Sequence, residues 1–166
     1  MLLVRTMRIS DLLDTRLVLP ALAAAHKNEA LAQLASRLAS EHPEIDRHQL
    51  IAVLDDRERQ MSTALEGGVA IPHARLDGLT RMAAVLGRSL DGISCDSHDG
   101  KPTHLFLLLV VPARSPGPHL KVLATASRLL HDERCRGRLL KASDEVGLLA
   151  ALRDEENRVH GADHAA

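Results

Sequence analysis

STALEGGVAIPH, residues 62–73, is the stretch of sequence from which we infer the fold and the site. The pair Gly67-Gly68 is typical of a turn, and the apolar run Val69–Ile71 that follows predicts a short buried strand. Pro72 has no backbone N–H to donate to a neighbouring strand, so we expect the strand to end there. His73 would then lie just past a strand end, where α/β sheets usually carry their binding and catalytic groups.

Two histidines and one arginine are candidates for chemistry. The imidazole of His73 titrates near neutral pH and is a good nucleophile that can accept a group covalently. His119 follows a loop with three prolines and is expected to open an amphipathic helix, whose N-terminal N–H groups favour an anion such as phosphate. Arg57, expected at the end of an earlier helix, can provide a fixed positive charge next to the same anion.

Together, these three side chains form a coherent phosphotransfer site, with an acceptor imidazole, a second imidazole and an arginine clamp. The alternative is that His73 faces solvent in a loop and that the three are unrelated surface groups, since ten histidines are scattered along the chain.

Composition limits the class of protein. The 166 residues suffice for one domain with a full core, and 45% apolar with 26% charged residues is ordinary for a globular chain. With one Phe and no Tyr or Trp, the core must be aliphatic, and aromatic platforms for stacking bases are missing. Because the net charge is −1, no global field favours DNA or an anionic membrane, and we expect no nucleic-acid partner.

The cysteines and the apolar runs indicate a cytoplasmic protein. Cys95 and Cys135 lie forty residues apart and form neither a CxxC motif nor a disulfide framework, so we expect reduced thiols. The longest apolar run, Leu105–Val111, is too short to span a bilayer, and the N-terminus has no signal-peptide pattern. We therefore expect no direct insertion into a membrane.

Helices and strands are predicted in mixed order. Helical spacing or capping residues predict five helices. Three of them are expected over Lys27–Ser40, Asp132–Leu140 and Ser143–Leu152. A fourth helix begins after Asp46 and has the apolar face Leu50, Ile51, Val53 and Leu54, and a fifth begins at His119 and has the apolar face Leu120, Leu123, Ala124, Leu129 and Leu130. Strands are predicted at Arg16–Leu19, Met82–Leu90 and Thr103–Val111, with turns at Asp91-Gly92 and Asp99-Gly100.

The predicted fold class is α/β, a single domain with a mixed β-sheet and helices packed on both faces. We expect a leader at residues 1–8, the domain at residues 9–154, and a polar C-terminal tail at residues 155–166 that frays.

A metal site has little support in the sequence. His98 and His104 flank the strand that begins at Thr103, but no HExxH or clustered Cys/His spacing accompanies them. A metal-dependent hydrolase that uses His73, His119 and His98 is the weakest of the alternatives, and no metal is expected.

Two separated motifs resemble a known family. Arg57-Glu58 followed by Ser62-Thr63 fits R-E-x-x-x-S-T, residues 68–73 fit G-[IV]-A-I-P-H, and PHLKVLA at residues 118–124 contains H-L-x-x-L. In this order they resemble the mannitol/fructose-class enzyme IIA domains of the bacterial phosphotransferase system. The similarity extends over residues 9–152, nearly the whole chain.

The resemblance implies a mixed sheet between helices and a role for each candidate residue. It implies that His73 carries the phosphoryl group as a covalent phosphohistidine, that His119 neighbours and orients it, and that Arg57 helps to hold it. Family members are phosphotransferase components that receive phosphate from the histidine phosphocarrier protein and bind no cofactor.

The turn before the strand departs from the family pattern S-T-G-I-G-x-G, because Ala64 and Glu66 replace glycines. If those positions required positive φ, each replacement would cost about 1 kcal/mol or more. A carboxylate at Glu66 near a phosphohistidine would also repel it. Glu66 is therefore a secondary site candidate, as are Ser62 and Thr63, which belong to the same motif.

The family has two branches. Nitrogen-regulatory members are commonly stand-alone and regulate target proteins through their phosphorylation state, whereas sugar-specific members pass phosphate to a IIB domain that feeds a transporter. Because this chain has no room for a IIB domain, we predict the nitrogen-regulatory branch. A fructose- or mannitol-specific IIA remains an alternative, as does a binding module of the same fold that has lost transfer through the Glu66 change.

Overall fold

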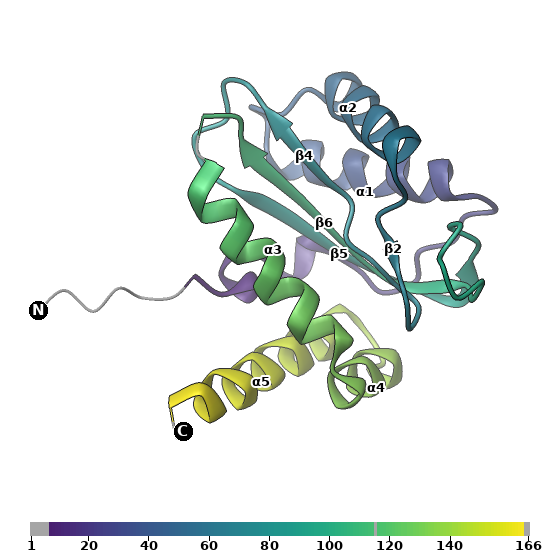
Figure 1. Cartoon of the computed structure of the whole chain (residues 1–166), viewed down its shortest axis with the longest axis vertical. Helices are drawn as coiled ribbons and strands as arrows, with labels where there is room; N and C mark the ends of the chain where they lie inside the picture. The colour runs from purple at the N-terminus through teal and green to yellow at the C-terminus, as the bar shows by residue number, and fades with distance from the viewer. Residues whose placement is uncertain (1–6, 115, 165–166) are drawn as a thin grey trace, which may run out of the picture.

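The computed structural model describes residues 7–114 and 116–164, so most of the predicted leader at residues 1–8 lies outside the described residues. Its sheet is mixed and open, with the strand order β1-β5-β6-β3-β2 and with β4 also paired to β6 (Figure 1). The strands are β1 (Val18–Leu19), β2 (Ala64–Leu65), β3 (Val69–Ala70), β4 (His73–Leu76), β5 (Ala83–Ile93) and β6 (Thr103–Pro112).

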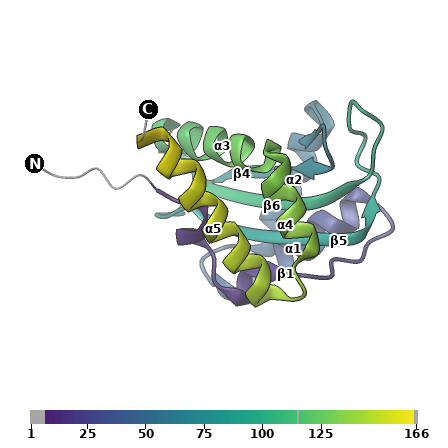
Figure 2. The same cartoon turned by 90° about the horizontal axis from the view of Figure 1, so that it is seen from below.

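Helices cover both faces of this sheet, which confirms the predicted fold class. They are α1 (Lys27–Glu41), α2 (Arg47–Gln60), α3 (Pro116–His131), α4 (Glu133–Lys141) and α5 (Glu145–His164). Figure 1 and Figure 2 show α1 and α2 on one face of the sheet and α3, α4 and α5 on the other. Among the described residues, no helix is both long enough and apolar enough to cross a membrane.

The sheet is built on β6, which confirms the prediction of a central strand over Thr103–Val111. β6 pairs antiparallel with β5 and parallel with both β3 and β4. All residues of Leu105–Val111 are buried, because helices pack on both faces. Apart from Phe106, the side chains of this run are aliphatic, as the composition predicts.

β3 and β4 are short strands that lie end to end along β6. Val69 is opposite Leu105 and His73 is opposite Leu109, and between these pairs the N–H of Leu109 donates to the carbonyl of Pro72 at 3.0 Å. The strand prediction is right for β3, and His73 follows the end of that strand as expected. It begins β4, however, and does not lie in the solvent-facing loop of the alternative interpretation. Pro72 lacks an N–H yet still accepts through its carbonyl, so it interrupts the pairing without ending it.

β5 continues through the predicted turn at Asp91-Gly92, so that prediction is wrong. Gly92 has φ +81°, and its N–H donates to Oγ of Ser89 at 3.1 Å. A Cβ at Gly92 would lie 2.7 Å from Cβ of Pro102. The glycine therefore serves an irregularity inside a strand, where the register with β6 shifts, and not a turn between elements.

Two element starts near the chain's ends also differ from prediction. β1 holds only Val18–Leu19, because Thr15–Leu17 forms a 3-10 turn, in which the N–H of Arg16 donates to the carboxylate of Asp14 at 2.8 Å. At α5, the first turn is capped by the carboxylate of Asp144, which accepts from the N–H of Gly147 at 2.8 Å, and not by Ser143.

α3 begins earlier than predicted, and its buried face agrees only in part with the predicted one. It starts at Pro116, so His119 is its fourth residue and does not open it. Leu120 and Ala124 were assigned to the apolar face but are exposed, while Val122 and Ala126 are buried together with Leu129 and Leu130. The buried set follows helical spacing, and it leaves Leu120 beside the candidate site.

α5 extends to His164, and so covers the described part of the segment that was expected to fray. Its buried Glu156 accepts from the N–H of Ile9 at 2.6 Å, and the side chain of Glu155, which is 1% exposed, contacts Arg138 at 3.1 Å and Arg158 at 2.6 Å. These polar residues hold α5 against α4 and the first described turn. Over residues 155–164 the prediction of a frayed tail is wrong, because the composition of a segment does not reveal its distant partners, and residues 165–166 lie outside the described residues.

Truncation of β6 should be far more destabilising than truncation of an exposed strand residue. Leu108→Ala empties a site that is 0% exposed and should lower the free energy of unfolding by about 2–5 kcal/mol. Leu90→Ala on β5, where the side chain is 63% exposed, should change it by less than about 0.5 kcal/mol. Urea denaturation of both variants measures the difference, and similar losses would contradict the assignment of β6 as the core strand.

Candidate functional site

His73 lies at the sheet edge where α2 and α3, which belong to opposite helical layers, approach β4 (Figure 1). A pocket opens between these three elements and brings together His73, His119 and Arg57. It is lined by Val53, Asp56, Arg57 and Gln60 of α2, by His73, Ala74 and Arg75 of β4, and by His119, Leu120 and Leu123 of α3.

A backbone carbonyl sets the tautomer of His73. Nδ1 of the half-buried ring lies 3.0 Å from the carbonyl oxygen of Ile71. Because a carbonyl only accepts, Nδ1 carries the hydrogen, and in the neutral ring Nε2 keeps its lone pair. The nitrogen available as a nucleophile is therefore Nε2.

The surroundings of His73 keep this imidazole neutral. Burial is the main cause that lowers its pKa from the ordinary value of 6.5, because an imidazolium loses hydration there. The positive charge of Arg57 and the nearby His119 also lower the pKa, while the bond to Ile71 and the charge of Glu58 oppose them. At pH 7 the ring is thus in the form that can act as a nucleophile.

Arg57 is held in the last turn of α2, as predicted. Its Nη1 donates to the carbonyl of Met61 at 3.1 Å. The adjacent Glu58 points elsewhere: its carboxylate accepts from the N–H of Thr63 at 3.0 Å and from the Thr63 hydroxyl, and it pairs with Nζ of Lys27 at 3.3 Å. Glu58 therefore ties the end of α2 to the following turn and so fixes where Arg57 lies.

The secondary candidates Ser62 and Thr63 lie in that turn and do not line the pocket of His73. Oγ of Ser62 donates to the carbonyl of Cys95 at 3.0 Å and accepts from the N–H of Ala64 at 3.2 Å. The hydroxyl of Thr63 donates to Glu58. Their contacts shape the chain between α2 and β2.

Glu66 lies away from His73, at the turn between β2 and β3. The pairings of Val69 and His73 with β6 lie four residues apart, which separates them by about 13 Å along the sheet, and Glu66 lies beyond Val69. Among the described residues, the only non-glycine with positive φ is Asp96, so neither Ala64 nor Glu66 is strained. The expected strain and the expected repulsion of a phosphohistidine are both absent from this geometry.

Arg75 is the site residue that sequence reasoning missed. Its Nη2 donates to Nε2 of His119 at 2.8 Å, and His119 is only 3% exposed. The available signal was its spacing, because residues two apart in a strand project to the same face, and Arg75 is two residues after His73.

The start of α3 contributes fewer N–H donors than expected. Pro116 and Pro118 have no backbone N–H, so within the first four residues only Gly117 and His119 have one. Positive charge at the site therefore comes mainly from arginine side chains.

Within the described ranges, no group of three or more His, Cys, Asp or Glu side chains could hold a metal ion, and His98 is exposed on a loop away from the pocket. Cys95 and Cys135 are free, buried thiols, as predicted. Burial raises the pKa of Cys135 to about 12, so this thiol stays protonated.

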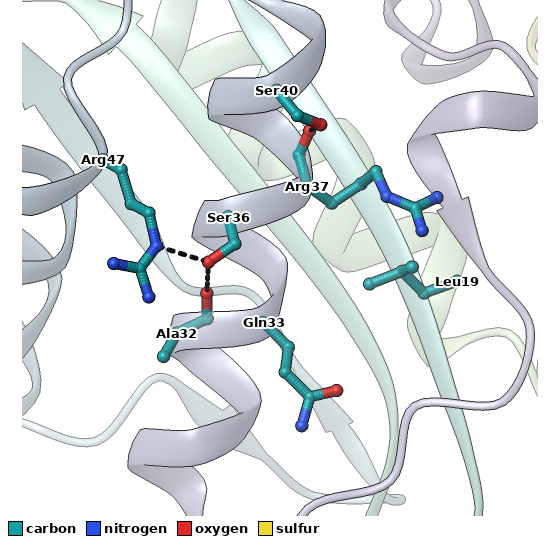
Figure 3. Close-up of a pocket in the computed structure, with 7 residues that line it drawn as sticks. All are labelled: Leu19, Ala32, Gln33, Ser36, Arg37, Ser40 and Arg47. Atoms are coloured by element: carbon teal, nitrogen blue, oxygen red, sulfur yellow. Dashed lines mark hydrogen bonds between the residues drawn. The ribbon is translucent and has the colours of Figure 1, made fainter.

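A second pocket runs along α1 between β1 and the start of α2 (Figure 3). Nε of Arg47 donates to Oγ of Ser36 at 2.6 Å, and Nη1 of Arg37 donates to the carbonyl of Arg16 at 2.9 Å. Figure 3 shows the guanidinium groups of Arg37 and Arg47 on opposite sides of α1. They do not converge on one point, so the pocket at His73 is the stronger candidate site.

Comparison with known families agrees with this fold. The family described as phosphoenolpyruvate-dependent sugar phosphotransferase system, EIIA 2, matches residues 11–155. The chain belongs to this family, whose members are components of a phosphotransfer system.

Relatives carry both regulatory and sugar-specific names. The chain is 35% identical over 146 residues to a nitrogen regulatory protein of Bradyrhizobium diazoefficiens, which covers 88% of this chain and 95% of the relative. It is 29% identical over 150 residues to the fructose-specific EIIABC component of Bacillus subtilis, where it spans 90% of this chain but only 24% of the relative.

Solved structures share the fold. The nitrogen regulatory protein IIA-Ntr of Neisseria meningitidis superimposes with a TM-score of 0.81 at 27% identity, over 87% of this chain and 98% of that one. Enzyme IIA of the mannitol system, solved in complex with phosphorylated enzyme IIB from Escherichia coli, gives a TM-score of 0.71 at 17% identity. The superposition covers 86% of this chain and 97% of that one. The latter likeness concerns the fold alone.

The lowered pKa of His73 can be measured directly. An NMR titration should place its midpoint below the ordinary value of 6.5, and Arg57→Gln should raise that midpoint because it removes a cation that disfavours the imidazolium. As the pH falls through the unfolded-state pKa, the unfolded chain binds this proton first, so His73 lowers the stability on acidification. A midpoint at or above 6.5 in the wild type would contradict the described environment.

Proposed function

We propose that the protein is a IIA-type phosphocarrier that accepts a phosphoryl group on His73 from the phosphohistidine of the histidine phosphocarrier protein. The observation that carries this proposal is the bond from Nδ1 of His73 to the carbonyl of Ile71, which presents the Nε2 lone pair in a pocket with arginine side chains. Family membership supports it, since the family belongs to a phosphotransfer system.

Transfer proceeds in line. The lone pair of Nε2 attacks phosphorus as the N–P bond of the donor breaks and its electron pair returns to the donor imidazole. The His73 ring gains positive character while Nδ1 keeps its hydrogen, so the hydrogen bond to the carbonyl of Ile71 strengthens. Arg57 stabilises the oxygens of the phosphoryl group, and His119 orients the guanidinium of Arg75, from which it accepts a hydrogen bond.

Of the two branches, we infer the nitrogen-regulatory one, in which the phosphorylation state of the protein regulates target proteins. The 35% identical relative, of which 95% is covered, and the solved structure with a TM-score of 0.81 both carry nitrogen-regulatory names. The buried, free thiols Cys95 and Cys135 fit a reducing compartment such as the cytoplasm.

A sugar-specific IIA is the second candidate function. The fructose-specific relative, which is 29% identical over 150 residues, supports it. In that case the phosphoryl group on His73 would pass to a IIB domain instead of serving as a regulatory signal.

The acceptor can be tested by intact mass after incubation with phosphoenolpyruvate, enzyme I and the histidine phosphocarrier protein. The wild type should gain about 80 Da, one phosphoryl group, and His73→Ala should gain nothing. His48→Ala is a matched control, since His48 is exposed on α2 outside the pocket, and it should be labelled like the wild type.

Labelling of His73→Ala would overturn the acceptor assignment. An unlabelled wild type with an intact fold would support the non-transferring binding module instead. The branches separate in a second step: chase of the labelled protein with purified fructose and mannitol IIB domains should leave the label in place, and its rapid loss to IIB would favour the sugar-specific function.

A further inference from the structure

Two arginines from different elements line the pocket of His73, and one N–H group of each is engaged by the protein. Arg57 of α2 donates to the carbonyl of Met61 at 3.1 Å, and Arg75 of β4 donates to Nε2 of His119 at 2.8 Å. A guanidinium carries five N–H donors in a planar fork. Each arginine therefore has further donors to offer to a bound oxyanion.

The backbone directs Arg75 to the same side as His73. The two residues alternate with Ala74 and Leu76, which are buried, while Arg75 itself is exposed. A long, exposed arginine would normally sample many rotamers. Its bond to the almost fully buried His119 restricts it beside the acceptor ring before any phosphoryl group arrives.

The same bond limits what His119 can do. A guanidinium only donates, so Nε2 of His119 must be the acceptor. While it accepts from Arg75, that nitrogen has no hydrogen to donate to a phosphoryl oxygen. The remaining N–H groups of Arg75 can face the oxyanion from this side of the pocket.

We propose that Arg75 is the second cationic ligand of the phosphoryl group on His73, opposite Arg57, and that His119 is a positioning residue that holds Arg75 in place. This inference rests on the proposed phosphocarrier function and deepens it. Arg75 makes and breaks no covalent bond: its N–H groups donate to the phosphoryl oxygens, and its protons stay on the guanidinium.

Single-turnover transfer from the phosphorylated histidine phosphocarrier protein tests the role of Arg75. Arg75→Gln should slow transfer about 10- to 100-fold, the loss of one charge-assisted hydrogen bond. Arg75→Lys keeps the charge without the fork and should recover part of the rate. Arg59→Gln is the matched control, because Arg59 lies two residues after Arg57, pairs with Asp56 at 3.3 Å and does not line the pocket. It should stay within about twofold of the wild type.

Variants of His119 test the positioning role. His119→Gln keeps an acceptor for Arg75 and should retain most of the rate, whereas His119→Leu should slow transfer. In the Arg75→Gln background, His119→Leu should add less than about threefold, because its partner is already gone. The ¹⁵N NMR signals of the His119 ring should show an unprotonated Nε2 in the wild type and should change in Arg75→Gln.

The outcomes separate the two proposals. If Arg75→Gln transfers at the wild-type rate while His73→Ala is inert, the role of Arg75 is wrong and the proposed function stands. If the losses from Arg75→Gln and His119→Leu multiply, the positioning role of His119 is wrong. A wild type that accepts no phosphoryl group would overturn the proposed function, and this inference with it.

Discussion

The candidate site depends on how β3 and β4 pair with β6 across Pro72. Alternate carbonyls of a strand point to opposite sides, and that of Pro72 faces β6, where it accepts from Leu109. The carbonyl of Ile71 therefore faces away from β6 and is available to Nδ1 of His73. A proline that interrupts the sheet thus places the imidazole and also selects which of its nitrogens is nucleophilic. The buried strand β6 makes that placement rigid.

The positive charges around His73 affect both the pKa of its imidazole and the stability of a phosphoryl group bound to it. Burial is the main cause that lowers the pKa of His73, and Arg57 lowers it further. In the proposed function, the same cation would stabilise the negative phosphoryl group once the N–P bond has formed. Arginine suits this role because its charge does not change over the physiological pH range. The bond of Arg75 to a buried imidazole adds a second cation whose position is restrained. In the proposed function, these two cations would bind the oxygens of the phosphoryl group.

Several residues of the family motif act on the shape of the site and not inside it. Glu58 joins Lys27 of α1 to Thr63, and Ser62 joins the same turn to the carbonyl of Cys95. These contacts hold the end of α2, and with it Arg57, against β4. Glu58 and Ser62 therefore contribute to the site indirectly, because they fix the position of the helix end that carries Arg57.

Local patterns by themselves determined the central strand β6, the α2 cap at Asp46 and the placement of His73 beside a strand, because hydrophobic spacing, caps and proline act over a few residues. Of the candidate site, the sequence motifs predicted three residues, His73, His119 and Arg57. Only the tertiary structure decided that Arg75 donates to His119, forty-four residues away, and that the buried carboxylates of Glu155 and Glu156 pack within α5. Such pairings are set by packing between distant segments, and no local pattern records them.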